Sequence, residues 1–241
     1  MGRLFSIIIP TLNEEENLEA CLESIVRQSY DDYEVVIVDG GSDDGTVEVA
    51  ERYGFRVVEA EKRRPHDVAY ARNLGAKLSR GDLLFFLDAD TLMEPHCLEV
   101  FEAHLRDPRV AAALCRVLPL KGNPIERLMY EFNNVARRIS NISGLYELSY
   151  FSCPCYRRSC FEKAGGFRED LYACEDLDLA LRARHLGRYV YISETTLWTS
   201  PRRLRMWSYH GYIARYLRYL AEYYILDRVT MPYEDLTVLR D

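Results

Sequence analysis

The chain has 241 residues, of which 48% are apolar, and a formal net charge of −7. This length and composition suffice for one sizeable hydrophobic core, so a single α/β domain is the simplest organisation. The negative charge argues against a general nucleic-acid-binding protein. The first residues lack the pattern of a secretory leader, which predicts a cytoplasmic protein.

Strand and helix patterns alternate through the first half of the chain. Short apolar runs predict buried strands at 4–10, 34–38, 55–59 and 83–87. Apolar residues at helical spacing predict helices at 15–28, 45–53, 67–78 and 95–105. Alternation of this kind predicts a mostly parallel sheet that is covered by helices on both faces.

The second half is less regular. Strands are predicted at 110–118, 148–156 and 189–192. Helices are predicted at 124–139, 175–185 and 204–226. The helix at 124–139 has four apolar residues on one side, namely Ile125, Leu128, Met129 and Phe132. We therefore divide the chain into a catalytic domain, 1–200, and a C-terminal amphipathic helical extension, 201–241.

The last predicted helix carries a stripe of tyrosines. They recur at intervals of three and four, as Tyr209, Tyr212, Tyr216, Tyr219 and Tyr223. Tyrosine favours membrane interfaces and the nearby arginines favour anionic headgroups, so the stripe is consistent with contact to the cytoplasmic face of a membrane. The alternative is that the stripe packs against the chain's own core or against a second subunit.

Acidic residues follow three predicted strands at their carboxyl ends, where open parallel sheets bind ligands. Glu14 follows the first strand, Asp39 ends the second, and Asp88 and Asp90 follow the fourth. Two carboxylates two residues apart in extended chain point to the same side. They repel each other unless a cation lies between them, and oxygen ligands suit Mg²⁺ or Mn²⁺, which also binds substrate phosphates. An ordinary acidic turn is the alternative for the Asp88–Asp90 pair.

Five segments, in this order, resemble the family 2 inverting glycosyltransferases of the GT-A fold. They read SIIIPTLNEEENL, VVIVDGGSDDGT, ARNLGAKLSRGDLLFFLDADT, GGF and CEDLDLALRARHLG, and they span about residues 4–190. The resemblance implies a Rossmann-like nucleotide-sugar-binding domain. It also implies transfer of a hexose from a nucleotide sugar with the help of Mn²⁺ or Mg²⁺.

The resemblance further implies roles for individual residues. The donor side would be formed by Pro10, Thr11, Glu14, Asp39, Arg72, Asn73, Asp88, Ala89 and Asp90. The metal would be held by Asp88 and Asp90, with His210 either as a further ligand or as a structural residue. Asp176 would be the catalytic base, with Glu175 beside it. The acceptor side would include Gly166, Phe167, Arg202 and Arg203.

The chemistry of these residues agrees with the implied roles. A sugar hydroxyl is a weak nucleophile, so a carboxylate such as Asp176 can take its proton. Capping of a helix N-terminus, where negative charge is favoured, is the alternative for Glu175 and Asp176. A polyprenyl phosphate acceptor would need no base, so the acidic pair favours a hydroxyl of a saccharide or a lipid-linked glycan.

The sequence leaves open alternatives for the donor sugar nucleotide and for the reaction class. The resemblance to archaeal and bacterial mannosyl- and glucosyltransferases suggests GDP-mannose, with a UDP-sugar as the alternative donor. A nucleotidyltransferase also uses carboxylates at strand ends and a metal, but it usually carries a basic, glycine-rich loop after the first strand, where this chain is acidic. An inactive nucleotide-binding domain is the non-enzymatic alternative.

Overall fold

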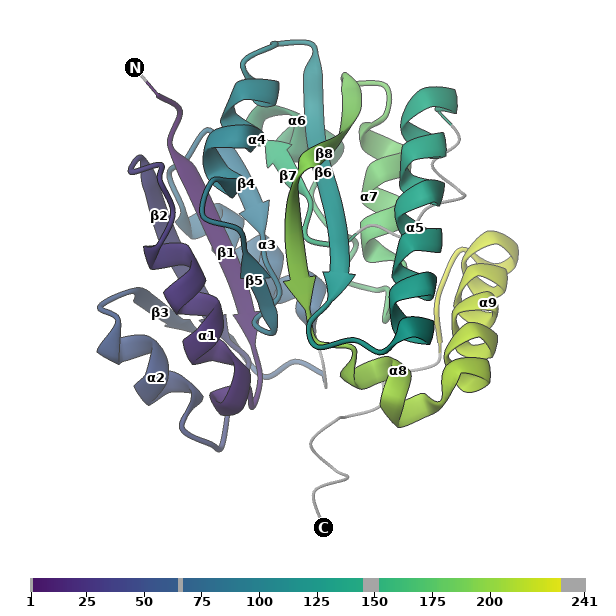
Figure 1. Ribbon diagram of the computed structural model, residues 1–241, viewed down its shortest axis with the longest axis horizontal. Helices are drawn as coiled ribbons and strands as arrows, with labels where there is room; N and C mark the ends of the chain where they lie inside the picture. The colour runs from purple at the N-terminus through teal and green to yellow at the C-terminus, as the bar shows by residue number, and fades with distance from the viewer. Residues whose placement is uncertain (1, 65–66, 145–151, 231–241) are drawn as a thin grey trace.

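The computed structural model describes residues 2–64, 67–144 and 152–230, which form a central eight-stranded sheet with helices on both faces (Figure 1). The strands are β1 (Phe5–Thr11), β2 (Tyr33–Asp39), β3 (Arg56–Glu59), β4 (Leu83–Phe86), β5 (Thr91–Met93), β6 (Val110–Pro119), β7 (Cys155–Arg157) and β8 (Arg188–Thr199). The helices are α1 (Glu15–Val26), α2 (Thr46–Arg52), α3 (Val68–Leu78), α4 (Cys97–Leu105), α5 (Pro124–Ser143), α6 (Arg158–Ala164), α7 (Glu175–Ala183), α8 (Arg202–Trp207) and α9 (Tyr209–Leu226).

The strand order in the sheet is β3-β2-β1-β4-β7-β6-β8-β5. The first four strands of this order are parallel neighbours, and β6 and β8 are also parallel. Short β7 runs antiparallel between β4 and β6, and β5 runs antiparallel to β8 at the edge. The predicted α/β fold is confirmed, with two short antiparallel strands joining the parallel ones.

The apolar runs of the central strands are buried on both sides of the sheet. In β1, Phe5, Ile7 and Ile9 belong to one hydrophobic cluster and Ile8 to another. Helices α1, α2 and α4 contribute to the first cluster, and α3, α6 and α7 contribute to the second. Gly75 lets α3 approach β1 closely, because a Cβ atom there would lie 2.4 Å from Cγ2 of Ile8.

Several elements differ from the sequence prediction. Strand β5 and helix α6 were not predicted, since three and seven residues show little periodicity. The strand predicted at 148–156 is limited to Cys155–Arg157 in the described part, and 148–151 lie outside the described residues. The single helix predicted at 204–226 is wrong, because Ser208 adopts a φ of 58° and separates α8 from α9.

The tyrosine stripe of α9 faces the chain's own core. Tyr219 is fully buried in a cluster with Leu171, Ala173 and Val229, and the Tyr223 hydroxyl donates a hydrogen bond to Asp178 at 3.0 Å. The core-packing alternative therefore describes these tyrosines. Among the described residues, none of the helices has the length and apolar character needed to cross a membrane. The domain division at 200/201 stays a prediction.

Candidate active site

Most of the predicted site residues line one cleft at the carboxyl ends of the central strands. This cleft has a volume of about 1,590 Å³. From the predicted set it is lined by Pro10, Thr11, Glu14, Arg72, Asp88, Ala89, Asp90, Glu175, Asp176, Arg202 and Arg203. The two strand-end acids and the acidic pair of α7 thus share one hollow, although they lie 85 or more positions apart along the chain. Asp88 and Asp176 do not point apart, because both contact the same arginine.

That arginine is Arg72 on α3, which is 4% exposed. Its Nη2 donates a hydrogen bond to Asp88 at 2.9 Å. Its Nη1 donates to Glu175 at 3.0 Å and to Asp176 at 3.1 Å. One buried cation therefore joins the strand-end acid to both acids at the start of α7, and it fixes the distance between the expected metal ligand and the expected base.

Burial sets the electrostatics of this group. Desolvation disfavours the ionised form of Asp176 and raises the pKa of its carboxyl well above the ordinary value, against the attraction of Arg72. Repulsion from Glu175 and Asp88 raises the pKa of Asp176 further. Burial alone would lower the pKa of Arg72, but the attraction of the three acids outweighs it, so that pKa is raised and the guanidinium stays charged.

Asp90 contacts the first residue of α8. Its Oδ2 is 3.2 Å from Nε of Arg202, and its Oδ1 accepts a hydrogen bond from the Thr199 hydroxyl at 3.3 Å. Arg202 also donates to Glu14, at 2.9 Å for Nη1. Burial raises the pKa of Asp90 to about 6, with Arg202 opposing the shift and Asp88 adding to it. A cation at this carboxylate is therefore stabilising, and here Arg202 supplies it.

Asp39 is 3% exposed, and its carboxylate is engaged by its own chain. Oδ1 accepts hydrogen bonds from the hydroxyls of Thr11 at 2.9 Å and Ser42 at 2.6 Å. Oδ2 accepts from the backbone N–H groups of Gly41 at 2.9 Å and Ser42 at 2.8 Å. A carboxylate has about four acceptor positions, so contact between Asp39 and a base requires one of the two hydroxyls to turn away.

Besides Asp39, four predicted residues do not line the cleft. Asn73 holds the following turn instead, because its side chain bonds to both N–H and C=O of Phe167 at 2.9 Å. Gly166 has a φ of 70°, and a Cβ there would lie 2.8 Å from Oδ1 of Asn73. Phe167 is 3% exposed and packs behind Arg72, 5.4 Å from its guanidinium. His210 is exposed on α9 and is not brought to the Asp88–Asp90 pair.

The residues present fit a divalent cation at Asp88 and Asp90. Within 2–64, 67–144 and 152–230, no group of three or more His, Cys, Asp or Glu residues could hold a metal. A two-carboxylate site does not require such a group, because Mg²⁺ is usually held by one or two carboxylates together with substrate phosphates. Both acids line the cleft and both already attract a guanidinium, so the site favours positive charge.

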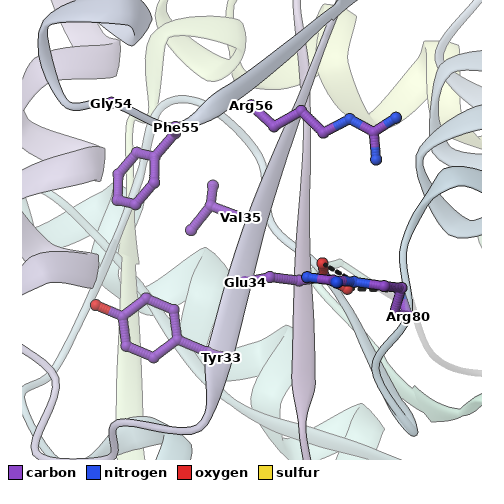
Figure 2. Close-up of a pocket in the computed structure, with 7 residues that line it drawn as sticks. All are labelled: Tyr33, Glu34, Val35, Gly54, Phe55, Arg56 and Arg80. Atoms are coloured by element: carbon purple, nitrogen blue, oxygen red, sulfur yellow. Dashed lines mark hydrogen bonds and ion pairs between the residues drawn. The ribbon is translucent and has the colours of Figure 1, made fainter.

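A second, smaller hollow of about 420 Å³ lies at the opposite ends of the strands (Figure 2). It is lined by the first residues of β2, by 54–56 and by Arg80. Its one carboxylate, Glu34, accepts hydrogen bonds from the Ser6 hydroxyl at 2.7 Å and from Nε of Arg80 at 3.4 Å. Burial opposes ionisation of Glu34, but the hydrogen bond from the backbone N–H of Arg80, together with those from Ser6 and the Arg80 side chain, lowers its pKa. Glu34 is thus held by side chains of the chain itself, and the large cleft is the candidate active site.

The sequence profile of glycosyl transferase family 2 matches residues 6–165. The chain belongs to this family. An uncharacterised glycosyltransferase of Haemophilus influenzae is 30% identical to this chain over 189 residues. The match covers 74% of this chain and 61% of the relative. The poly(ribitol-phosphate) β-N-acetylglucosaminyltransferase TarP of Staphylococcus aureus is 28% identical over 66% of this chain and 50% of its own length. The chain thus spans 50–61% of the length of these two relatives.

Solved structures share the fold of this family 2 glycosyltransferase. S. aureus TarS in complex with UDP-GlcNAc has a TM-score of 0.67 at 23% identity, covering 81% of this chain and 58% of that one. The mannosyltransferase PcManGT from Pyrobaculum calidifontis, in complex with GDP-Man and Mn²⁺, has a TM-score of 0.66 at 23% identity, covering 96% of this chain and 66% of that one. These likenesses establish the GT-A fold.

Sequence reasoning missed two contributions to the site. Thr199, at the end of β8, contacts Asp90 but was not among the predicted residues. Arg72 was expected to meet the nucleotide, but its guanidinium here bridges Asp88 and the α7 acids. A lone arginine inside an apolar helix pattern, in a domain with several strand-end acids, was the one available signal for this bridge.

Proposed function

We propose that this glycosyltransferase is an inverting, metal-dependent enzyme that moves a hexose from a nucleotide sugar to a hydroxyl group. The observation that carries the proposal is the shared contact of Asp88 and Asp176 with Arg72 inside one cleft. This contact joins an acid suited to a metal with an acid suited to proton transfer. A nucleotidyltransferase has no need for the second acid, and an inactive domain has no need for either.

In the proposed mechanism, Asp88 and Asp90 would hold Mn²⁺ or Mg²⁺. Bound there, the cation would neutralise the charge that grows on the departing diphosphate. Pro10, Thr11, Glu14, Asp39 and Ala89 surround the nucleotide. Arg72 also lies within reach of donor phosphates, and Arg202 and Arg203 flank the acceptor side of the cleft.

Asp176 acts as the general base of the reaction. It takes the proton of the acceptor hydroxyl while that oxygen bonds to the anomeric carbon and the carbon–oxygen bond to the diphosphate breaks. Attack from the side opposite the leaving group inverts the anomeric carbon. The raised pKa of Asp176 makes it a stronger base than an ordinary aspartate, and Arg72 and neighbouring Glu175 hold its orientation.

GDP-mannose is the donor that we propose first, because PcManGT was solved with GDP-Man and Mn²⁺ and its likeness covers 96% of this chain. A UDP-sugar is the second candidate, since TarS binds UDP-GlcNAc at a similar TM-score. A saccharide or lipid-linked glycan is the proposed acceptor. A lipid-linked acceptor would bring the chain to the cytoplasmic face of a membrane, where α9 offers the exposed apolar residues Ile213 and Leu217 beside the cleft.

A thermal-shift panel of nucleotide sugars, with and without Mn²⁺, tests this proposal. One donor should stabilise the chain, and only when the metal is present, because a cation held by the two acids would neutralise the charge of the diphosphate. The matched variants Asp88→Asn and Asp90→Asn should lose that stabilisation. Equal stabilisation without Mn²⁺, or unchanged stabilisation in both variants, would overturn the metal-dependent function.

A further inference from the structure

Helix α5 presents its apolar side to solvent and its polar side to the protein. Its buried residues are Glu126, Asn134, Arg137 and Ser140. Six of its large apolar residues are 47–78% exposed, and they are Ile125, Leu128, Phe132, Val135, Ile139 and Ile142. A surface helix of a monomeric protein normally has the reverse arrangement. A continuous exposed apolar stripe of this length marks an interaction surface.

The helix cannot turn to bury this stripe, because hydrogen bonds fix its polar side inward. Oδ1 of Asn134 accepts from N–H of Val117 at 3.0 Å, and its Nδ2 donates to C=O of Val117 at 2.9 Å. Glu126 caps the helix through Asn123 and accepts from Nε of Arg205 at 2.7 Å. The outward direction of the stripe therefore belongs to the fold.

The spacing of the stripe identifies the kind of partner. The six residues follow one another at intervals of three, four, three, four and three, which is the a/d pattern of a two-stranded coiled coil. The flanking positions carry both signs of charge, with Glu131 and Arg138 on the same side of the stripe. An acid at the border of the stripe suits a protein partner better than an anionic lipid surface.

We propose that α5 pairs with α5 of a second copy of this chain as an antiparallel coiled coil about a two-fold axis. In the register that places Phe132 opposite Val135 of the partner subunit, Leu128 faces the partner's Ile139. In the same register, Ile125 faces the partner's Ile142. Every stripe residue then has an apolar partner and none extends past the end. A two-fold axis uses the same surface on both copies, as isologous dimers do.

Charge complementarity selects this antiparallel direction. The register above brings Glu131 beside Arg138 of the partner subunit, and the symmetry repeats the pair. Within the described residues Arg138 is exposed and forms no ion pair, whereas Glu131 contacts Arg116. A parallel arrangement would instead place Glu131 beside Ala136 of the partner subunit, where no opposite charge is available.

The exposed area is of the size that a dimer requires. Six apolar side chains exposed to this extent offer roughly 600 Å² of accessible surface per protomer, without the residues that flank them. A standard protein–protein interface buries about 800 Å² per partner. Leu128 and Phe132 also line the active-site cleft. The second copy would therefore lie along one wall of the cleft.

Sedimentation equilibrium of the whole chain tests the pairing. The wild-type chain of 28.1 kDa should reach twice that mass at about 100 µM. Val135→Asp should raise the dissociation constant by roughly tenfold or more, because it places a charge in the central layer. The matched control is Ile225→Asp on α9, which is 79% exposed and outside the stripe, and it should leave the mass unchanged.

Two further measurements test the register. Arg138→Glu and Glu131→Arg should each weaken the dimer, and the double variant should restore it. An oxidised mixture of Phe132→Cys and Val135→Cys chains should form mixed disulfide dimers in excess of either self-linked dimer, with the parent chain as the control for native thiols.

A chain that stays monomeric at about 100 µM, or a dimer that survives Val135→Asp, would overturn the proposal. Co-sedimentation of a monomeric chain with phosphatidylglycerol vesicles, lost in Val135→Asp, would assign the stripe to a lipid surface and would equally overturn it. None of these readouts depends on sugar transfer, so the outcome is separate from that of the proposed enzymatic function.

Discussion

Replacement of Arg72 by Met should destabilise the fold because three acids depend on this one buried cation. The guanidinium contacts Asp88, Glu175 and Asp176 at 2.9–3.1 Å. Methionine keeps an unbranched apolar stem and carries no charge, so the variant removes the cation with only a modest loss of side-chain volume. The acids then remain in a site that is shielded from water, and Asp88 alone keeps appreciable exposure, at 29% of its side chain.

The size of the effect follows from the cost of uncompensated buried charge. Removal of one partner from a buried ion-pair group costs about 3–5 kcal/mol. For a chain of this length that loss lowers the melting temperature by roughly 10 °C. The free energy of unfolding should fall most at alkaline pH. Loss of the cation raises the pKa of Asp176 further. A carboxyl whose pKa is higher in the folded state than in the unfolded state lowers the free energy of unfolding at pH values above its unfolded-state pKa.

Denaturant titrations at about pH 5 and pH 8 measure this directly, and the loss should be smaller at the lower pH, where the acids take up protons. Arg27→Met is the matched control, because its pair with Glu23 is exposed, at 72% and 49% of the two side chains, and contributes little. If Arg72→Met unfolds with the wild-type free energy at pH 8, the bridging role of this arginine is wrong.

Three smaller predictions concern single contacts. Mn²⁺ affinity, measured by titration calorimetry, should fall as the pH drops below about 6, because the raised pKa of Asp90 lets a proton compete with the metal; equal affinity at about pH 5 and pH 7 would contradict this role. Gly75→Ala should lower the free energy of unfolding by about 1–3 kcal/mol, because the new methyl group meets Ile8, and a stabilised variant would show that α3 can move away. Tyr223→Phe should cost about 1 kcal/mol by removing a hydrogen bond to buried Asp178, and no loss would mean that water replaces it.

The sequence was sufficient for the parallel core of the fold, because β1, β2 and β4 are uninterrupted apolar runs. It was insufficient for elements that local pattern does not specify. Strand β5 has three residues and exists because Thr91–Met93 pairs with the end of β8, more than a hundred residues away. The break at Ser208 carries no glycine or proline; a side-chain bond from N–H of Gly211 to the Ser208 hydroxyl caps α9 there.

The site was predictable to the extent that strand position determines it. Asp88 and Asp90 were expected in one cleft with Asp176, and in the structure all three residues line the same cleft; their roles stay predictions. The partners of these acids were not predictable, since Arg72 and Arg202 reach them through tertiary packing. The outward direction of the apolar side of α5 could not be read from periodicity either, because periodicity finds an apolar side without showing what covers it.

Transfer and donor binding by Asp176→Asn give the most direct test of the central claim, that separate acids in one cleft hold the metal-bound donor and take the acceptor proton. The account predicts that kcat falls by about 10²–10⁴-fold, while the dissociation constant of the nucleotide sugar with Mn²⁺ stays within a few-fold of wild type. Transfer at the wild-type rate, or loss of donor binding in parallel with loss of transfer, would contradict it.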